Sequence, residues 1–224
     1  MVKAATDKAI RNIRTPEQTE RVLAREVEIL GKPPRLAPVE RASVAAEVHA
    51  ITARLREEVV GNAAPISLDL IPEIMFTLCR YPDLWDAILQ LSLRLQNATA
   101  VLPPRARQLA ILRTAWLLQA PYEWGEHVKH ARKLGFSDDD MDRLIIGSSA
   151  PGWDEHDRAV VQTCEELREN AMVTDQTWEK LGERLNDQQR FELLVLIGHF
   201  TNVAYFQNSL RLRLESSNEG LKAR

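Results

Sequence analysis

Cysteine and glycine are scarce in this chain, with 2 and 9 occurrences among 224 residues. Cys79 and Cys164 each lie in an apolar, helix-like pattern and no CxxC pair exists, so free buried thiols are a better interpretation than a disulfide. Most of the 11 prolines fall at segment edges, and apolar residues recur every three to four positions without sustained alternation. This pattern predicts an all-α fold.

An excess of one charge is also missing. The 29 Lys and Arg residues are interleaved with 32 Asp and Glu residues, which gives a formal net charge of −3. This balance argues against nucleic-acid binding and against charge-driven membrane binding. The longest apolar run, FELLVLIGHF, is too short to cross a bilayer, and the N-terminus lacks the apolar segment of a secretory signal. We therefore expect a cytoplasmic protein.

Helix-boundary signals are clearest near the N-terminus. Thr15, Pro16 and Gln18 form a capping box with proline in the first turn, and Gly31 is expected to end the helix. The apolar line of this helix is expected at the positions Leu23, Val27 and Leu30. The chain is divided into an N-terminal helical arm, a main helical domain and a flexible C-terminal tail, at 1–36, 37–214 and 215–224.

Further helices are expected over 40–60 and, in two pieces broken near Pro82, over 72–96. A nearly all-apolar helix from Pro104 predicts a buried element, and Pro121 breaks it and starts a helix that ends at Gly135. The remaining helices are expected after the caps Ser137 and Thr174, over 154–171, and from Asp187 to about Leu214.

The stretch YEWGEHVKHA, residues 122–131, carries the candidate chemistry. On a helix Glu123, His127 and His130 fall at positions i, i+4 and i+7, on one face, and Glu126 and His130 form a second i, i+4 pair. A carboxylate at this spacing holds an imidazole ring and favours its protonated form, as a general acid or base requires.

Neighbouring residues suggest a pocket around this pair. Tyr122 and Trp124 are expected to supply apolar walls, and Gln108 and Arg113 lie on the preceding buried helix. A guanidinium in such apolar surroundings must find a carboxylate, either of the protein or of a substrate. The structural alternatives stay open: the Glu–His pair is often only a helix contact, and Arg113 is often only a core ion pair.

The segment LPPRARQLAILRTAWLLQAPYEWGEHVKHARKLGFSDDDMDRL resembles the carboxymuconolactone decarboxylase family of the alkylhydroperoxidase-D-like superfamily. The likeness lies in the R-x-x-x-L-x-I-L-R helix, in YEW-x-x-H-x-x-x-A-x-x-x-G, and in the acidic start of the next helix. It extends more loosely over residues 66–212. The resemblance implies an alkylhydroperoxidase-D-like helical bundle that is assembled as a trimer or hexamer. The additional N-terminal arm has no counterpart in the minimal decarboxylase.

The resemblance also assigns roles. Glu123 and Ala120 stand where the peroxidase branch has its two cysteines, so thiol peroxidase chemistry is not expected, and Gln108 stands at or near a usual glutamate. The decarboxylase branch uses no metal and no organic cofactor. Under this interpretation His127 donates the proton, and Glu123 orients and charges the His127 ring. The substrate-binding residues are Arg113, Tyr122, Trp124, His130 and Gln108.

Three hypotheses follow for the function. The first is a cofactor-independent lyase acting on a small carboxylated lactone or keto acid, as in the metabolism of aromatic compounds. The second is a non-catalytic helical oligomer that binds a small molecule or serves a structural role. The third is a metal-dependent hydrolase or oxygenase using Glu123, His127 and His130, although this spacing matches no strong zinc signature.

Overall fold

The structure, a computed structural model, describes residues 15–36, 39–60, 64, 67–68, 71–97 and 99–224. The predicted all-α fold is confirmed, and no strand occurs in the described part. In chain order its α-helices are α2 (Pro16–Leu30), α3 (Ala45–Val60), α4 (Glu73–Leu78), α5 (Pro82–Gln96), α6 (Pro104–Leu117), α7 (Pro121–Lys133), α8 (Asp138–Ile146), α9 (Glu155–Asn170), α10 (Asp175–Gly182) and α11 (Asp187–Leu210). Two 3-10 turns, η1 (Arg41–Val44) and η3 (Gly220–Lys222), complete the described elements. None of the helices among these residues is both long and apolar enough to span a bilayer.

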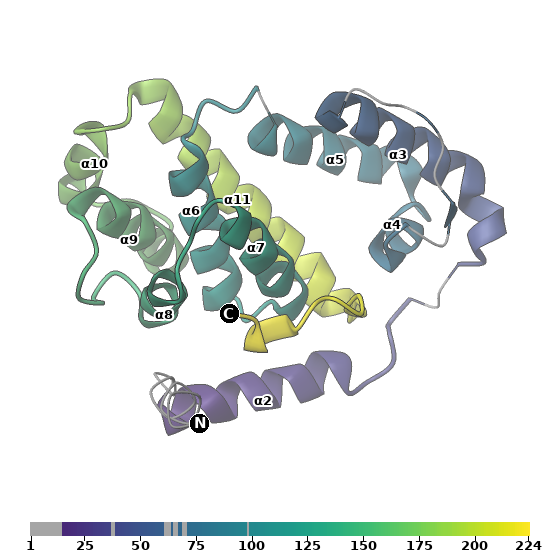
Figure 1. The fold of residues 1–224 in the computed structure, drawn as a ribbon, viewed down its shortest axis with the longest axis horizontal. Helices are drawn as coiled ribbons and strands as arrows, with labels where there is room; N and C mark the ends of the chain where they lie inside the picture. Colours follow the sequence, from purple (N-terminus) through teal and green to yellow (C-terminus); the bar gives the residue numbers. More distant parts are fainter. Residues whose placement is uncertain (1–14, 37–38, 61–63, 65–66, 69–70, 98) are drawn as a thin grey trace, which may run out of the picture.

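Helix α6 is the centre of the larger core. It packs against α7, α9 and α11, so apolar side chains are buried around its whole circumference, as its sequence predicts (Figure 1). The fully buried side chains of this core include Leu109, Leu112, Trp124, Leu144 and Leu193. Because α7 lies directly on α6, side chains on their facing sides meet in a dry interior.

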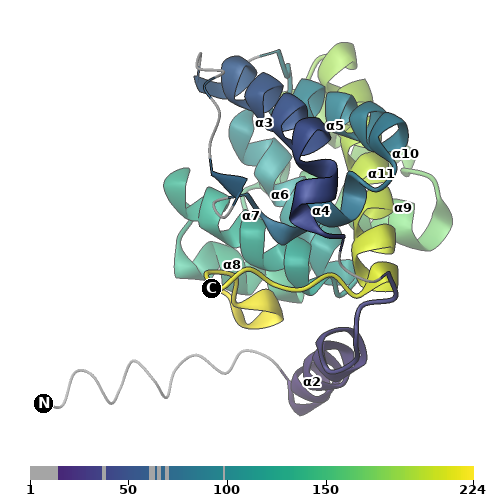
Figure 2. The same ribbon diagram turned by 90° about the vertical axis from the view of Figure 1, so that its right-hand side faces the viewer.

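A second apolar cluster joins α3, α4 and α5 at one end of the molecule (Figure 1), the end that faces the viewer in Figure 2. Val48, Phe76 and Cys79 are almost completely buried in it. The predicted break near Pro82 is confirmed, since α4 and α5 are separate helices. Helix α5 also packs against α11, which connects this layer with the larger core.

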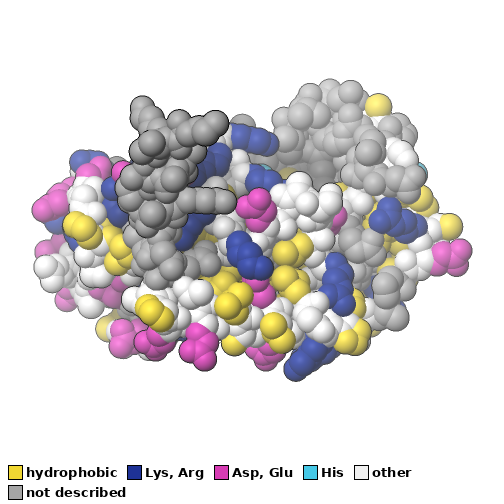
Figure 3. Space-filling view, turned by 60° about the horizontal axis from the view of Figure 1, so that its bottom comes forward, with side chains coloured by type: hydrophobic (Ala, Val, Ile, Leu, Met, Phe, Trp, Pro, Cys, Tyr) yellow, Lys and Arg dark blue, Asp and Glu magenta, His cyan; other side chains and the backbone are white. Residues whose placement is uncertain are grey.

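Helix α2 forms the N-terminal arm and keeps the predicted capping box of Thr15 and Gln18. However, the apolar line expected at Leu23, Val27 and Leu30 is not the side of α2 that packs on the body. Val22 and Ile29 are buried against the body, whereas Leu23 and Val27 are 50% and 67% exposed. Exposed apolar side chains of this kind are visible among charges on the face that carries α2 (Figure 3).

A buried glutamate explains why the sequence does not reveal the side of α2 that packs on the body. Glu26 sits between Val22 and Ile29 and is 9% exposed, and its carboxylate pairs with Lys222 Nζ at 2.9 Å. A charged residue in the sequence predicts a solvated face, and the ion pair with the distant Lys222 offsets part of the cost of burying Glu26. Further contacts fix the arm, since Arg25 Nε donates to the Gln119 carbonyl at 3.3 Å.

The C-terminal segment differs from its expected role as a flexible tail over 215–224. Leu221 is completely buried, η3 packs on α7, and the Trp124 indole donates to the Ala223 carbonyl at 3.1 Å. Asn218 Nδ2 donates to the Tyr122 carbonyl at 2.9 Å, and a Cβ at Gly125 would lie 1.8 Å from Asn218 Oδ1. The short, polar sequence of residues 215–224 does not predict that this segment packs on α7. The close approach of Asn218 depends on Gly125, which lies in α7.

Most predicted helix ends are confirmed. Ser137 and Thr174 cap α8 and α10, and Gly135, with φ +83°, follows the end of α7. Helix α11 ends at Leu210, before the predicted position, because Arg211 adopts a left-handed conformation and its N–H bonds back to Gln207 and Asn208. Both cysteines are free and buried, as predicted.

Candidate active site

Helix α7 presents the predicted Glu–His motif to the core. Gln119, with φ +48°, closes the turn after α6, and Pro121 occupies the first turn of α7. Glu123 therefore lies in the first turn, where a negative charge is favoured by the helix dipole. One turn later, His127 Nε2 lies 2.9 Å from Glu123 Oε1. The predicted i, i+4 contact is present, and the two residues are only 5% and 6% exposed.

The other ring nitrogen of His127 faces Gln108 on α6. Gln108 Nε2 lies 2.9 Å from His127 Nδ1 and 2.9 Å from the His127 carbonyl oxygen. A carbonyl only accepts, so the amide must turn its NH₂ group toward both atoms. Nδ1 is then an acceptor, and the ring proton sits on Nε2 and is donated to the Glu123 carboxylate. This arrangement describes a neutral imidazole of defined tautomer.

The second oxygen of Glu123 is also occupied. Gln207 Nε2, from α11, donates to Glu123 Oε2 at 2.7 Å. Glu123, His127, Gln108 and Gln207, together called the closed cluster below, are all buried and connect three helices. Gln207 was not predicted as a site residue; its signal is its position two turns after His199 on the same strongly apolar helix.

Aromatic and imidazole rings surround the closed cluster. The edge of Phe200 contacts His127 at a centroid distance of 5.2 Å, and His130 lies 5.3 Å from His127. The His199 ring lies 5.3 Å from the Phe200 ring, and His199 Nε2 bonds to Ser92 Oγ at 2.6 Å. Burial lowers the pKa of both His130 and His199, and the neighbouring His127 lowers that of His130 further.

The predicted second pair, Glu126 with His130, does not form a hydrogen bond among the contacts described. Glu126 Oε1 instead accepts from Lys129 Nζ at 2.7 Å and from Asn218 Nδ2 at 2.9 Å. Within the described residues, no group of three or more His, Cys, Asp or Glu side chains is arranged to hold a metal ion. Both nitrogens of His127 are directed at protein atoms, so this geometry gives the metal hypothesis no support.

Two further predicted site residues serve the core. The Trp124 ring is completely buried, lies 4.9 Å from the Trp116 ring, and bonds to the C-terminal segment. Arg113 Nη1 donates to the carbonyls of Leu144 and Ile145 at 2.7 and 3.1 Å, and Nη2 pairs with Glu165 at 2.8 Å. Its guanidinium is thus directed at the end of α8, and the structure does not bring it to the closed cluster.

Tyr122 lies beside Glu123 at the start of α7 and is 8% exposed. Burial raises the pKa of its phenol, and the nearby carboxylate of Glu215 adds to this effect. The phenol therefore stays protonated, as a hydrogen-bond donor. Of the predicted substrate-binding residues, Gln108, Tyr122 and His130 lie beside the Glu–His pair or contact it.

Solved structures define the class of fold. An uncharacterised peroxidase-related protein from Ralstonia eutropha JMP134, described as an alkylhydroperoxidase AhpD core, superposes with TM-score 0.67 at 16% identity, over 83% of this chain and 94% of that one. A peroxidase-related protein from Silicibacter sp. TM1040 gives 0.61 at 13% identity, over 83% and 91%. The debrominase Bmp8, solved with 2,3,4-tribromopyrrole, gives 0.63 at 12% identity, over 83% and 95%. The fold is that of the alkylhydroperoxidase-D-like proteins.

The family resemblance is then confirmed at the level of sequence. Residues 82–166 match the model of the carboxymuconolactone decarboxylase family. This region runs from the start of α5 into α9 and includes Gln108, Glu123 and His127, but not Gln207. No curated protein shows significant sequence similarity to the chain.

Proposed function

We propose that the protein is a cofactor-independent lyase that moves protons on a small carboxylated lactone or keto acid. The 2.9 Å contact of Glu123 with His127, in a site from which water is excluded, is the observation that carries this proposal. An imidazole that is held by a carboxylate and kept away from bulk water is well placed for general acid–base catalysis. The match of residues 82–166 to the decarboxylase family supports the same conclusion.

The defined tautomer of His127 gives each atom a role. Glu123 accepts the Nε2–H bond and stabilises the positive charge that the ring carries when Nδ1 takes a proton. Nδ1 is the nitrogen that exchanges a proton with the substrate. Gln108 covers Nδ1 in this structure, so its amide must turn aside when substrate binds, and its NH₂ group then donates to a substrate carbonyl.

The chemical step needs no group beyond these. The carboxyl group of the substrate first gives its proton to Nδ1 of the neutral His127. The bond between the substrate carbon and the resulting carboxylate then breaks, CO₂ leaves, and the electron pair moves into the conjugated carbonyl as an enolate. The protonated Nδ1 of His127 then delivers a proton to carbon, and the ring returns to the neutral form that the structure describes. The carbonyl of the substrate is the electron sink, so the protein supplies only orientation and the proton.

Thiol chemistry receives no support at this site. Burial raises the pKa of Cys79 to about 11 and that of Cys164 to about 12, so neither thiol forms a thiolate readily. Neither cysteine is a member of the closed cluster. The peroxidase and debrominase names therefore describe the structural neighbours, and the proposal for this chain rests on Glu123 and His127.

The test is an assay of CO₂ release from carboxylated γ-lactones and β-keto acids. His127→Ala and Glu123→Gln should each reduce kcat by about 100-fold or more, which is the usual contribution of a general acid or base. His156→Asn changes a histidine of α9 outside the cluster and is the matched control, with unchanged kcat expected. If His127→Ala and Glu123→Gln released CO₂ as fast as the unchanged protein and His156→Asn, the proposal would be contradicted.

A second candidate function is a non-catalytic helical oligomer that binds a small molecule or is purely structural. One observation favours it: all four hydrogen-bonding atoms of the Glu123 carboxylate and the His127 ring are paired within the chain. Under this candidate, His127→Ala lowers stability and no carboxylated substrate is turned over. The predicted trimer or hexamer, tested by analytical ultracentrifugation, is compatible with both functions.

A further inference from the structure

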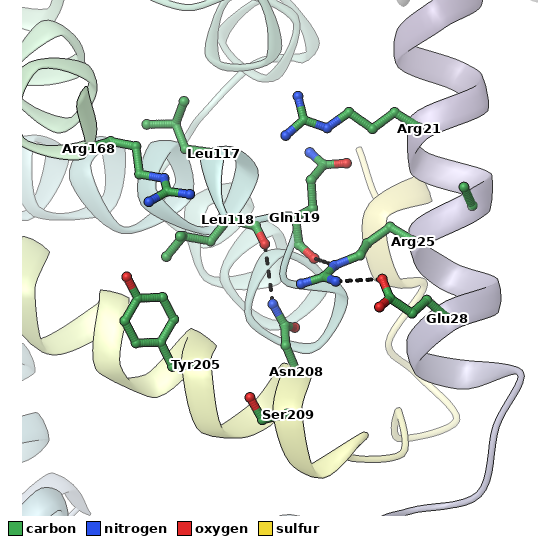
Figure 4. Close-up of a pocket in the computed structure, with 11 residues that line it drawn as sticks. Arg21, Arg25, Glu28, Leu117, Leu118, Gln119, Arg168, Tyr205, Asn208 and Ser209 are labelled. Atoms are coloured by element: carbon green, nitrogen blue, oxygen red, sulfur yellow. Dashed lines mark hydrogen bonds and ion pairs between the residues drawn. The ribbon is translucent and has the colours of Figure 1, made fainter.

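A separate hollow of about 440 Å³ lies between the N-terminal arm and the body of the protein (Figure 4). Its size is within the range of small-molecule pockets, roughly 300–1,000 Å³. Helix α2 supplies Arg21 and Arg25 on one side, and α9 and α11 supply Arg168 and Tyr205 on the other. We call this hollow the arm pocket; none of the four residues of the closed cluster lines it.

Two of the three arginines of the arm pocket have no charged partner in the described part of the chain. Arg25 donates to the Gln119 carbonyl and pairs with Glu28 at 2.7 Å, so its charge is balanced. Arg21 and Arg168 form no hydrogen bond or ion pair with any described residue. Their guanidinium groups extend toward the hollow from opposite sides (Figure 4). Two unbalanced guanidiniums on one hollow favour an anion, and their planar forks match a carboxylate.

The remaining residues that line the arm pocket suit the apolar part of an organic anion. Leu117 and Leu118 form an apolar surface between the arginines, and the ring of Tyr205, which is 54% exposed, borders it. Gln119 is 7% exposed, and its Oε1 atom is buried without a hydrogen-bond partner. An unpaired buried acceptor is costly unless a donor fills the site, and a ligand hydroxyl supplies such a donor.

The hollow also continues under the arm and along the body. A neighbouring hollow of about 320 Å³ shares Arg21, Leu117, Gln119 and Arg168 with the arm pocket. Another, of about 380 Å³ between α9 and α11, shares Leu117, Leu118, Arg168 and Tyr205. Arg168 and Leu117 thus border all three hollows, which leaves room for a ligand longer than a bare inorganic ion.

We propose that the arm pocket is a binding site for a small organic carboxylate with an apolar or aromatic body. Arg21 and Arg168 bind the carboxylate from opposite sides, Leu117 and Leu118 contact the body, and Gln119 accepts from a hydroxyl group. The arm is part of the site, because Arg21 comes from α2. The proposal does not depend on the acid–base function of the closed cluster, since no turnover enters it.

Isothermal titration calorimetry on the full chain tests the site with benzoate as the probe. About 10 mM salt is used, where the Debye length is about 30 Å and exposed guanidiniums are little screened. Benzoate should bind with a millimolar or lower dissociation constant. Arg21→Ala and Arg168→Ala should each weaken binding about fivefold, and the double variant should abolish it. Both arginines are exposed, so these variants are expected to fold.

Arg184→Ala is the matched control, because Arg184 is an exposed arginine elsewhere on the surface, held by Asp154 at 3.2 Å. It should bind benzoate like the unchanged protein. Benzyl alcohol tests the ring without the charge, and inorganic phosphate tests a charge without the ring; both should bind at least about tenfold more weakly. The proposal is overturned if either binds as tightly as benzoate, if benzoate does not bind, or if Arg21→Ala and Arg168→Ala behave like Arg184→Ala.

Discussion

The closed cluster and the arm pocket place polar groups in opposite situations. In the closed cluster every hydrogen-bonding atom of Glu123 and His127 has a partner within the chain, and both side chains are buried. In the arm pocket Arg21 and Arg168 are exposed and form no ion pair with any described residue. Buried polar groups are costly unless paired, whereas exposed cations cost little while they are solvated. The first region should therefore control stability, and the second should control binding.

The largest expected effect is that of Glu123→Ala on stability. The substitution leaves the Nε2–H group of His127 and the amide of Gln207 buried without their acceptor. The free energy of unfolding should fall by about 3 kcal/mol, as measured by urea denaturation. Glu123→Gln retains an acceptor oxygen and should lose clearly less. A loss below about 0.5 kcal/mol for Glu123→Ala would show that the cluster is not closed in solution.

Leu221→Ala tests the C-terminal segment that packs on the outer side of α7. Leu221 is fully buried in the main core, so removing its side chain leaves a cavity next to the helix that carries the pair. We expect a loss of about 2–3 kcal/mol in the free energy of unfolding. Leu134→Ala, a leucine that is 50% exposed, is the control and should change stability by less than about 0.5 kcal/mol. Equal effects of the two substitutions would indicate that the segment is not docked.

Acidification should weaken the fold through His199. Burial lowers its folded-state pKa below 6.5, although the nearby Glu123 opposes the shift. A lowered histidine pKa contributes stability above about pH 6.5, and this stability is lost as pH falls toward the folded-state value. The unfolding free energy should therefore decline from pH 7 to pH 5, and less steeply in His199→Gln. Identical slopes for the two proteins would contradict a buried, neutral His199.

The smallest expected effect on stability is that of Arg168→Ala. Because Arg168 is exposed and has no partner among the described residues, its loss should change the free energy of unfolding by less than about 0.5 kcal/mol. The same variant should lose benzoate affinity, which separates binding from stability. A destabilisation of 1 kcal/mol or more, measured by urea denaturation, would mean that the arm pocket is a structural contact after all.

Local patterns in the sequence account for much of the fold. The capping boxes at Thr15 and Ser137 and the break at Pro82 depend on residues within one turn, and the structure confirms them. The contact of Glu123 with His127 follows in the same way from their i, i+4 spacing. Interactions of this range can be predicted from local spacing, although the Glu126–His130 pair shows that a distant partner such as Asn218 can replace one of them.

The features that sequence reasoning missed depend on partners far away in the chain. Gln207 lies 84 residues from Glu123, and Arg113 finds its carbonyl acceptors 31 and 32 residues later. The apolar line expected at Leu23, Val27 and Leu30 is not the buried side of α2. The buried side carries Glu26, whose partner Lys222 lies far away in the chain. No local pattern encodes these contacts, since they arise only when α8, α11 and the C-terminal segment pack on α6 and α7.

The central claim is that Glu123 holds His127 as a neutral imidazole whose proton is on Nε2 and whose Nδ1 is the reactive nitrogen. Long-range ¹H–¹⁵N correlation spectroscopy of the imidazole rings at neutral pH measures this directly, with His127→Asn used to assign the signals. We predict a protonated Nε2 and an unprotonated Nδ1 for His127. A spectrum with the proton on Nδ1, or with rapid exchange between the two nitrogens, would contradict the account.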